Sequence, residues 1–163
     1  MLKKAVSLLL ILLTLTACAS NPVPEDNESV EATFEQDYSY LESIVTYLLS
    51  LEEDRVRIHC NPVKILGEYG ESMEFSDPQI EQIVHELAKK GYNYITKSYD
   101  IVVFDVWRKP IYGEFAAGFG YSDDGMVDAY AVSFLTYQEP LSTEHWCYYE
   151  ADYNEWRVRH TAK

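Results

Sequence analysis

The residues of this chain that could bind a metal ion do not form a complete metal-binding motif. His85-Glu86 matches the first two positions of the zinc-protease pattern HExxH, but Lys89 stands where the second histidine is required. A second group of acids surrounds Gly125 and lacks the glutamate that closes an EF-type calcium loop; its members are Asp123, Asp124 and Asp128. We therefore expect no metal ion and no other cofactor.

The residues that could catalyse a reaction also lack a recognisable arrangement. There is no GxSxG sequence, and His59, His145 and His160 have acids nearby only along the chain, which does not make a catalytic triad. Chance pairs of carboxylates are unavoidable among 27 Asp and Glu residues, so a glycoside-hydrolase pair remains an open alternative. The sequence favours a non-catalytic protein, and a deep pocket holding a histidine beside two carboxylates would favour a hydrolase instead.

Aromatic side chains are the most distinctive feature of the sequence. The chain contains 14 Tyr and 3 Trp residues, and many of them lie near its C-terminal end. Their faces are apolar and their rims polar, which suits a protein interface or stacking on a glycan. The candidate binding surface comprises Trp107, Trp146, Tyr148, Tyr149 and Trp156. The alternative is that these rings serve mainly as core, because aromatic residues favour strands and alternation turns about half of them inward.

The N-terminal segment resembles the signal peptide of a bacterial lipoprotein. Lys3 and Lys4 precede an apolar run, residues 5–15, that is too short to cross a bilayer. Leu15-Thr16-Ala17-Cys18 then resembles the lipobox. The resemblance covers residues 1–18 only, and it implies cleavage of residues 1–17 and a diacylglycerol and palmitate anchor on Cys18. It places the protein on a bacterial cell membrane or outer membrane, facing away from the cytoplasm.

Charge and composition predict how the rest of the chain is organised. The formal net charge is −14, which argues against nucleic acid as a partner. Residues 18–36 contain two prolines and many acids, and we predict a lipidated N-terminus followed by a disordered acidic tether. Residues 37–163 are long enough for one domain with a real core. The expected partners are the membrane, through the lipid, and a protein or glycan ligand.

Two cysteines remain if Cys18 carries lipid. Cys60 and Cys147 would then lie outside the cytoplasm, where disulfides persist. A bridge between them would close a loop of roughly 90 residues and stabilise the fold by about 4–5 kcal/mol. We predict this disulfide, and the alternative is a pair of unpaired buried thiols.

Two helices are predicted before an antiparallel sheet. Leu41, Ile44, Val45, Leu48 and Leu51 have the spacing of a helix with one buried face. A second helix begins at Ser76-Asp77-Pro78-Gln79, has a buried stripe, and ends at Gly91. Its stripe comprises Ile80, Ile83, Val84 and Leu87.

The remaining segments alternate in hydropathy as strands do. A short strand is predicted at Arg55–Cys60, a loop at Gly67–Phe75, and a five-stranded meander after Gly91. The five strands are expected at residues 99–108, 114–122, 126–137, 144–150 and 155–160, with a hairpin turn at Asp123-Asp124-Gly125. In the second strand Ala116, Gly118 and Gly120 leave one face almost without side chains, which indicates curvature or close approach by a helix.

The sequence therefore predicts an α+β domain with two helices packed on one face of an antiparallel sheet of about five strands. We expect a membrane-anchored lipoprotein that binds a ligand or protein without catalysis. The alternatives are a structural or assembly factor of the cell envelope and, less favoured, a hydrolase.

Overall fold

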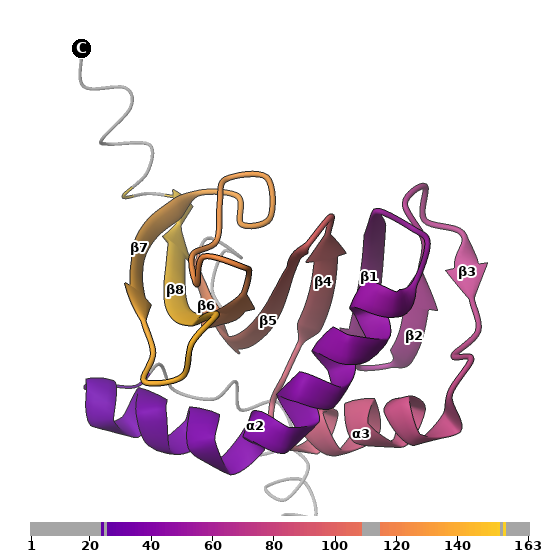
Figure 1. Cartoon of the computed structure of the whole chain (residues 1–163), viewed down its shortest axis with the longest axis horizontal. Helices are drawn as coiled ribbons and strands as arrows, with labels where there is room; N and C mark the ends of the chain where they lie inside the picture. The colour runs from indigo at the N-terminus through magenta and orange to yellow at the C-terminus, as the bar shows by residue number, and fades with distance from the viewer. Residues whose placement is uncertain (1–23, 25, 109–114, 154, 156–163) are drawn as a thin grey trace, which may run out of the picture.

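The computed structural model of the 163-residue chain describes residues 24, 26–108, 115–153 and 155. These residues form an α+β structure in which two helices cover one face of an eight-stranded antiparallel sheet (Figure 1). The elements are α2 (Asn27–Ser50), β1 (Arg55–Cys60), β2 (Val63–Leu66), β3 (Ser72–Met73), α3 (Pro78–Lys89), β4 (Tyr94–Ser98), β5 (Ile101–Arg108), β6 (Phe115–Tyr121), β7 (Leu135–Pro140) and β8 (Trp146–Asp152). Their order across the sheet is β3-β2-β1-β4-β5-β6-β8-β7.

Helix α2 begins ten residues before the predicted domain boundary at residue 37. Asp26 caps it, since its side chain accepts a hydrogen bond of 2.8 Å from the backbone N–H of Ser29. Val30 and Phe34 continue the buried stripe toward the N-terminus, and the Phe34 ring lies 5.2 Å from that of Trp146. Residues 27–36 therefore belong to the folded domain, and the prediction of a tether over them is wrong.

Helix α3 confirms the local signals at its two ends. The N-cap is Asp77, whose side chain accepts from the N–H of Gln79 at 2.8 Å, and Pro78 occupies the first turn. Ile80, Val84 and Leu87 are buried, and Gly91 adopts a φ of 94° just after the helix. Neither helix in the described part of the chain is long and apolar enough to cross a membrane.

The sheet has more strands than predicted and is not a simple meander. Strand β1 has the predicted bounds, whereas β2, β3 and β4 were missed. Of the strand predicted at 126–137, only residues 135–137 are extended, as the start of β7. Strand β6 pairs with β8, and β7 lies outside β8 at the edge, so residues 122–134 form a long connection. The last predicted strand, 155–160, falls almost wholly outside the described residues.

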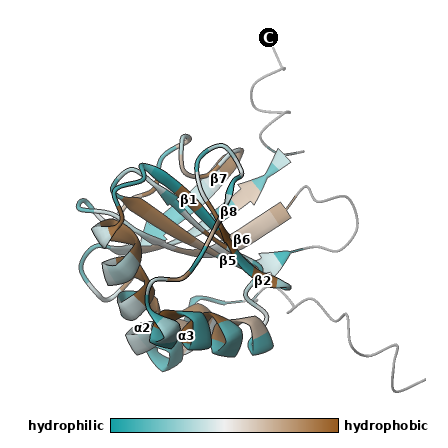
Figure 2. Cartoon of the chain, turned by 90° about the vertical axis from the view of Figure 1, so that its right-hand side faces the viewer, coloured by the Kyte–Doolittle hydropathy of each residue, from teal (hydrophilic) through white to brown (hydrophobic). Residues whose placement is uncertain are grey.

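The two faces of the sheet carry separate apolar clusters. The inner face packs against the helices and includes Phe104, Phe119 and Trp146, and Figure 2 shows the helices together on that side. The outer face carries a smaller cluster in which Val127 and Val132 of the 122–134 connection pack on the sheet. This connection, orange in Figure 1, therefore covers part of the face that the helices leave open.

Candidate functional site

The predicted aromatic binding surface is wrong for the residues that the structure describes. Trp107, Trp146, Tyr148 and Tyr149 are all buried, with exposed fractions of 1–4 %. Tyr149 faces outward but lies in the outer apolar cluster, while a bulge between Asp105 and Trp107 turns Trp107 into the inner core. Trp156, like Cys18, lies outside the described residues.

The predicted disulfide is not formed in the structure. Cys60 and Cys147 are both free and buried. Cys60 belongs to the inner cluster and Cys147 to the outer one, on strands β1 and β8 with three other strands between them. Neighbouring strands lie about 4.8 Å apart, so the separation far exceeds the Cα distance of about 7 Å that a disulfide can span.

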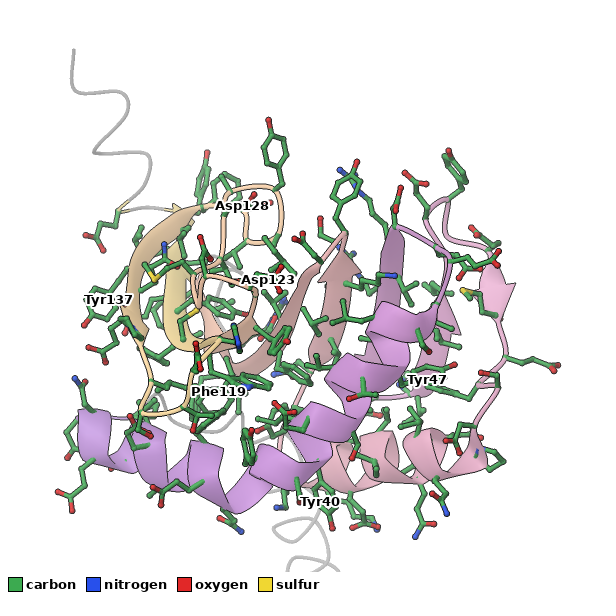
Figure 3. All side chains as sticks on the ribbon, viewed as in Figure 1. Tyr40, Tyr47, Phe119, Asp123, Asp128 and Tyr137 are labelled. Atoms are coloured by element: carbon green, nitrogen blue, oxygen red, sulfur yellow. The ribbon has the colours of Figure 1, made fainter. Side chains whose placement is uncertain are left out.

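The acids around Gly125 stabilise turns. Oδ1 of Asp124 accepts from the Ser122 hydroxyl at 2.9 Å and from the Met126 N–H at 3.0 Å. Oδ1 of Asp128 accepts from the N–H groups of Tyr130 and Ala131, both at 2.9 Å. Figure 3 labels Asp123 and Asp128 on this connection. Within the described ranges, no three His, Cys, Asp or Glu side chains are grouped closely enough to hold a metal ion.

A cavity of about 400 Å³ opens on the outer face of the sheet. Strands β1, β4, β5, β6 and β8 form its floor, and the 122–134 connection forms one wall. Its lining is Arg57, His59, Tyr94, Thr96, Val103, Asp105, Arg108, Ala116, Ala131, Val132, Ser133, Phe134, Tyr149 and Ala151. The floor is open because small residues, Ala116 and Ala151, and side-chain-free Gly118 lie between the larger ones.

The cavity continues toward the end of the sheet at which β1 begins. A second hollow of about 290 Å³ shares Arg57, Thr96 and Ala131 with it. A third, of about 220 Å³, shares Arg55 and Tyr130 with the second. We call this connected row of hollows the outer groove. It follows β1 and β4, and from His59 to Arg55 it covers about 13 Å of strand.

Register explains why polar side chains gather on this face. His59 pairs with Tyr94, Tyr94 with Asp105, and Asp105 with Gly118, so residues from four strands form one row. Arg57 and Thr96 form the neighbouring row. All three arginines that the structure describes, Arg55, Arg57 and Arg108, thus line the outer groove of a strongly acidic chain.

Asp105 and Arg108 form a partly buried ion pair at one end of the groove. Nε of Arg108 donates to Oδ2 of Asp105 at 2.7 Å, and its guanidinium lies 4.6 Å from the centre of the Tyr94 ring. The second carboxylate oxygen, Oδ1, is buried without a hydrogen-bond partner. Burial raises the pKa of Asp105, although Arg108 opposes the shift. Burial and then the Asp105 charge raise the pKa of Tyr149 well above its usual value.

Arg57 gives the middle of the groove an excess of positive charge. Among the described residues it has no ion-pair partner. The pKa of His59 is lowered by burial and by the nearby charges of Lys64 and Arg57, so the imidazole is neutral at pH 7. Because Asp105 and Arg108 neutralise each other, the lining of the 400 Å³ cavity keeps one positive charge that can attract an anion. The two further hollows contain acids as well as bases, namely Glu68, Asp100 and Asp128 beside Arg55 and Lys97, so the excess is confined to the cavity around Arg57.

The 400 Å³ cavity that His59 lines holds one described carboxylate, Asp105, which is paired with Arg108, and the other acids of the outer groove line the two further hollows. It therefore lacks the histidine beside two carboxylates that would favour a hydrolase.

The arginines of the outer groove could be predicted from the sequence, because Arg55, Arg57 and His59 alternate with buried Val56 and Ile58 in a predicted strand. The covering wall could not, because the sequence predicts a strand over residues 126–137, whereas residues 126–134 belong to the connection that forms the wall. No protein family, curated protein or solved structure gave a match to this chain.

Proposed function

We propose that this chain is a lipid-anchored extracytoplasmic lipoprotein whose domain is a non-catalytic binding module. The ligand site is the outer groove. The observation that carries the binding role is the combination, in adjoining hollows, of hydroxyl groups, apolar walls and an arginine, Arg57, that has no ion-pair partner among the described residues. The lipobox-like sequence at Leu15–Cys18 supports the anchor and a location on a bacterial cell membrane or outer membrane.

The binding role is tested by screening a library of small fragments against the isotope-labelled full chain in detergent, with backbone amide NMR shifts as the readout. We expect the shifts to cluster on β1, β4 and residues 130–134. Ala131→Trp should abolish them, because Ala131 lines both of the larger hollows. Ser39→Trp is the matched control, since Ser39 is exposed on α2 in the helix layer. Shifts that cluster elsewhere, or that survive Ala131→Trp, would overturn the site.

The anchor is tested by feeding an alkyne-tagged fatty acid to bacteria that express the protein. We expect the label and membrane fractionation to depend on Cys18, so that Cys18→Ala loses both. An unlabelled wild-type protein in the soluble fraction would refute the anchor and leave the groove unaffected.

A further inference from the structure

Two aromatic residues of the outer groove occupy backbone conformations that suit glycine. Tyr99 has a φ of 57° and Phe134 a φ of 62°, in the left-handed region that costs a non-glycine residue about 1–2 kcal/mol. Tyr99 lies in the two-residue turn between paired Ser98 and Ile101, where glycine or asparagine is usual. Strained residues of this kind cluster at ligand sites.

Three exposed aromatic side chains line the outer groove, namely Tyr99, Tyr130 and Phe134. Tyr99 is 54 % exposed and Tyr130 is 82 % exposed, and both line the hollow at the end where β1 begins. Arg55 lies 5.7 Å from the centre of the Tyr99 ring, on its face. Phe134 is 40 % exposed in the wall of the 400 Å³ cavity, where its ring packs against that of Tyr153. The outer groove thus combines exposed aromatic side chains with an excess of positive charge in the cavity around Arg57.

We propose that the outer groove binds an acidic oligosaccharide that carries a single carboxylate. This inference rests on the proposed function and names its ligand class. Arg57 takes the carboxylate, because a planar guanidinium matches a carboxylate with two parallel hydrogen bonds. The rings of Tyr99 and Tyr130 stack on sugar faces, whose C–H bonds carry partial positive charge and meet the negative face of an aromatic ring.

Charge and hydrogen-bonding capacity favour this ligand over a phosphate monoester or a peptide strand. The one excess positive charge of the cavity around Arg57, with His59 neutral, matches a single carboxylate. Asp100 and Asp128 line the hollow of Tyr99 and Tyr130 and disfavour further negative charge there. Hydroxyl groups of Thr96 and Ser133 line the same space and can bond sugar hydroxyls. An added peptide strand needs unpaired backbone groups, whereas β1 and β4 each pair on both sides.

Calorimetry on the full chain in a polyoxyethylene detergent, which has no sugar headgroup, tests the proposal. The probes are a trisaccharide with one terminal uronic acid, its methyl ester and inorganic phosphate. We expect binding of the acid, at least tenfold weaker binding of the uncharged ester, and no displacement of the acid by equimolar phosphate. Arg57→Ala should weaken binding of the acid at least tenfold. Lys64→Gln removes one charge from the same face outside the groove lining and should change affinity less than threefold.

Tyr99→Gly separates a ligand role from a structural one. Glycine relieves the strain of the positive φ at this position, so the melting temperature should not fall, while affinity for both the acid and the ester should. Failure of the uronic-acid trisaccharide to bind, equal binding of the ester, efficient competition by phosphate, or equal effects of Arg57→Ala and Lys64→Gln would each overturn the acidic-saccharide proposal. If fragments still map to the groove in that case, the binding function stands and only the ligand class is wrong.

Discussion

At the scale of single residues, buried charge in this molecule is found where separate elements must be joined. Asp37 of α2 is 3 % exposed. It forms an ion pair with Lys90 after α3, and the hydroxyl of Tyr92 donates to its Oδ2 at 3.0 Å. The carboxylate therefore links α2 to the segment that leads from α3 into β4. Removing one partner of a buried ion pair of this kind lowers the stability of the fold strongly.

Asp37→Ala should destabilise the domain strongly. The change leaves the Tyr92 hydroxyl buried without its acceptor and removes the ion pair of Lys90 with α2, and we expect the free energy of unfolding to fall by about 2–4 kcal/mol. Denaturant titration measures this. Glu86→Ala, which breaks the exposed pair with Lys89, is the control and should change the value by less than about 1 kcal/mol. Equal effects of the two substitutions would contradict the argument.

Asp105 predicts a particular pH dependence. Its pKa is raised in the folded state by burial, so the folded state holds the proton to a higher pH than the unfolded state does. Its contribution to stability is therefore fully present below the ordinary pKa of 3.8 and is lost as the pH rises through the folded value. Compared with wild type, Asp105→Asn should become progressively more stable over that rise and then level off. A difference in unfolding free energy that is flat with pH, or that falls, would disprove this.

The two buried thiols should be chemically inert in the native protein. Burial raises the pKa of Cys60 to about 12 and that of Cys147 to about 11, so almost no thiolate forms at neutral pH. We expect iodoacetamide to modify neither residue in the native chain and both in denaturant without any reductant, as read by peptide mass mapping. If modification in denaturant requires a reductant, the predicted disulfide between Cys60 and Cys147 is present after all.

At the scale of elements, the sequence predicts a helix or strand when its signals are local, but not when they depend on how the segment packs against the rest of the fold. The start, stripe and stop of α3 all lie within residues 76–91, so sequence alone located it. Strand β4 was missed because Lys97 occupies an inner-face position opposite Val56 and Val102. Its stem is buried while Nζ donates to the carbonyl of Leu51 at 2.8 Å, and a lysine at such a position hides the apolar alternation.

The glycines of strand β6 also show that the sequence does not predict which segment packs against a given strand. The near absence of side chains at Ala116, Gly118 and Gly120 predicts a curved strand or close approach by a helix, but the segments that approach the two glycines are not helical. The actual neighbours are the Phe104 carbonyl at Gly118 and the side chain of Val127 at Gly120. Which segment approaches depends on the bulge in β5 and on the 122–134 connection, and neither has a local sequence signal.

Gly118→Ala tests the contact between β5 and β6. A Cβ there would lie 1.8 Å from the Phe104 carbonyl oxygen. Backbone cannot move aside as a side chain can, so we expect a loss of about 2–3 kcal/mol in unfolding free energy. Gly70→Ala is the control, because its Cβ would meet nothing within 4 Å and only its φ of 82° disfavours alanine; it should lose about 1 kcal/mol. A smaller loss at Gly118 than at Gly70 would mean that the strands can separate there.

At the scale of the whole molecule, the domain boundary determines how far the groove stands from a membrane. The tether was predicted to extend to residue 36 because Glu28, Glu31 and Glu35 dominate the composition of that region. The spacing of Val30 and Phe34, four residues apart, instead matches one helical face. If Cys18 carries lipid, only residues 19–26 separate the anchor from α2, a segment whose full extension is about 28 Å.

This short link predicts a measurable distance. A donor dye at Glu28→Cys should transfer energy efficiently to acceptor dyes on lipid headgroups, because the chain cannot carry α2 further than about 28 Å from Cys18. Labelling is selective for the introduced thiol, since the pKa values of Cys60 and Cys147 keep them unreactive. Inserting ten Gly and Ser residues after Ser20 should lower the transfer efficiency while leaving the melting temperature unchanged. If the transfer efficiency does not respond to the insertion, the domain binds the membrane directly through one of its own surfaces. That surface, and not the lipid anchor, would then determine the orientation of the outer groove.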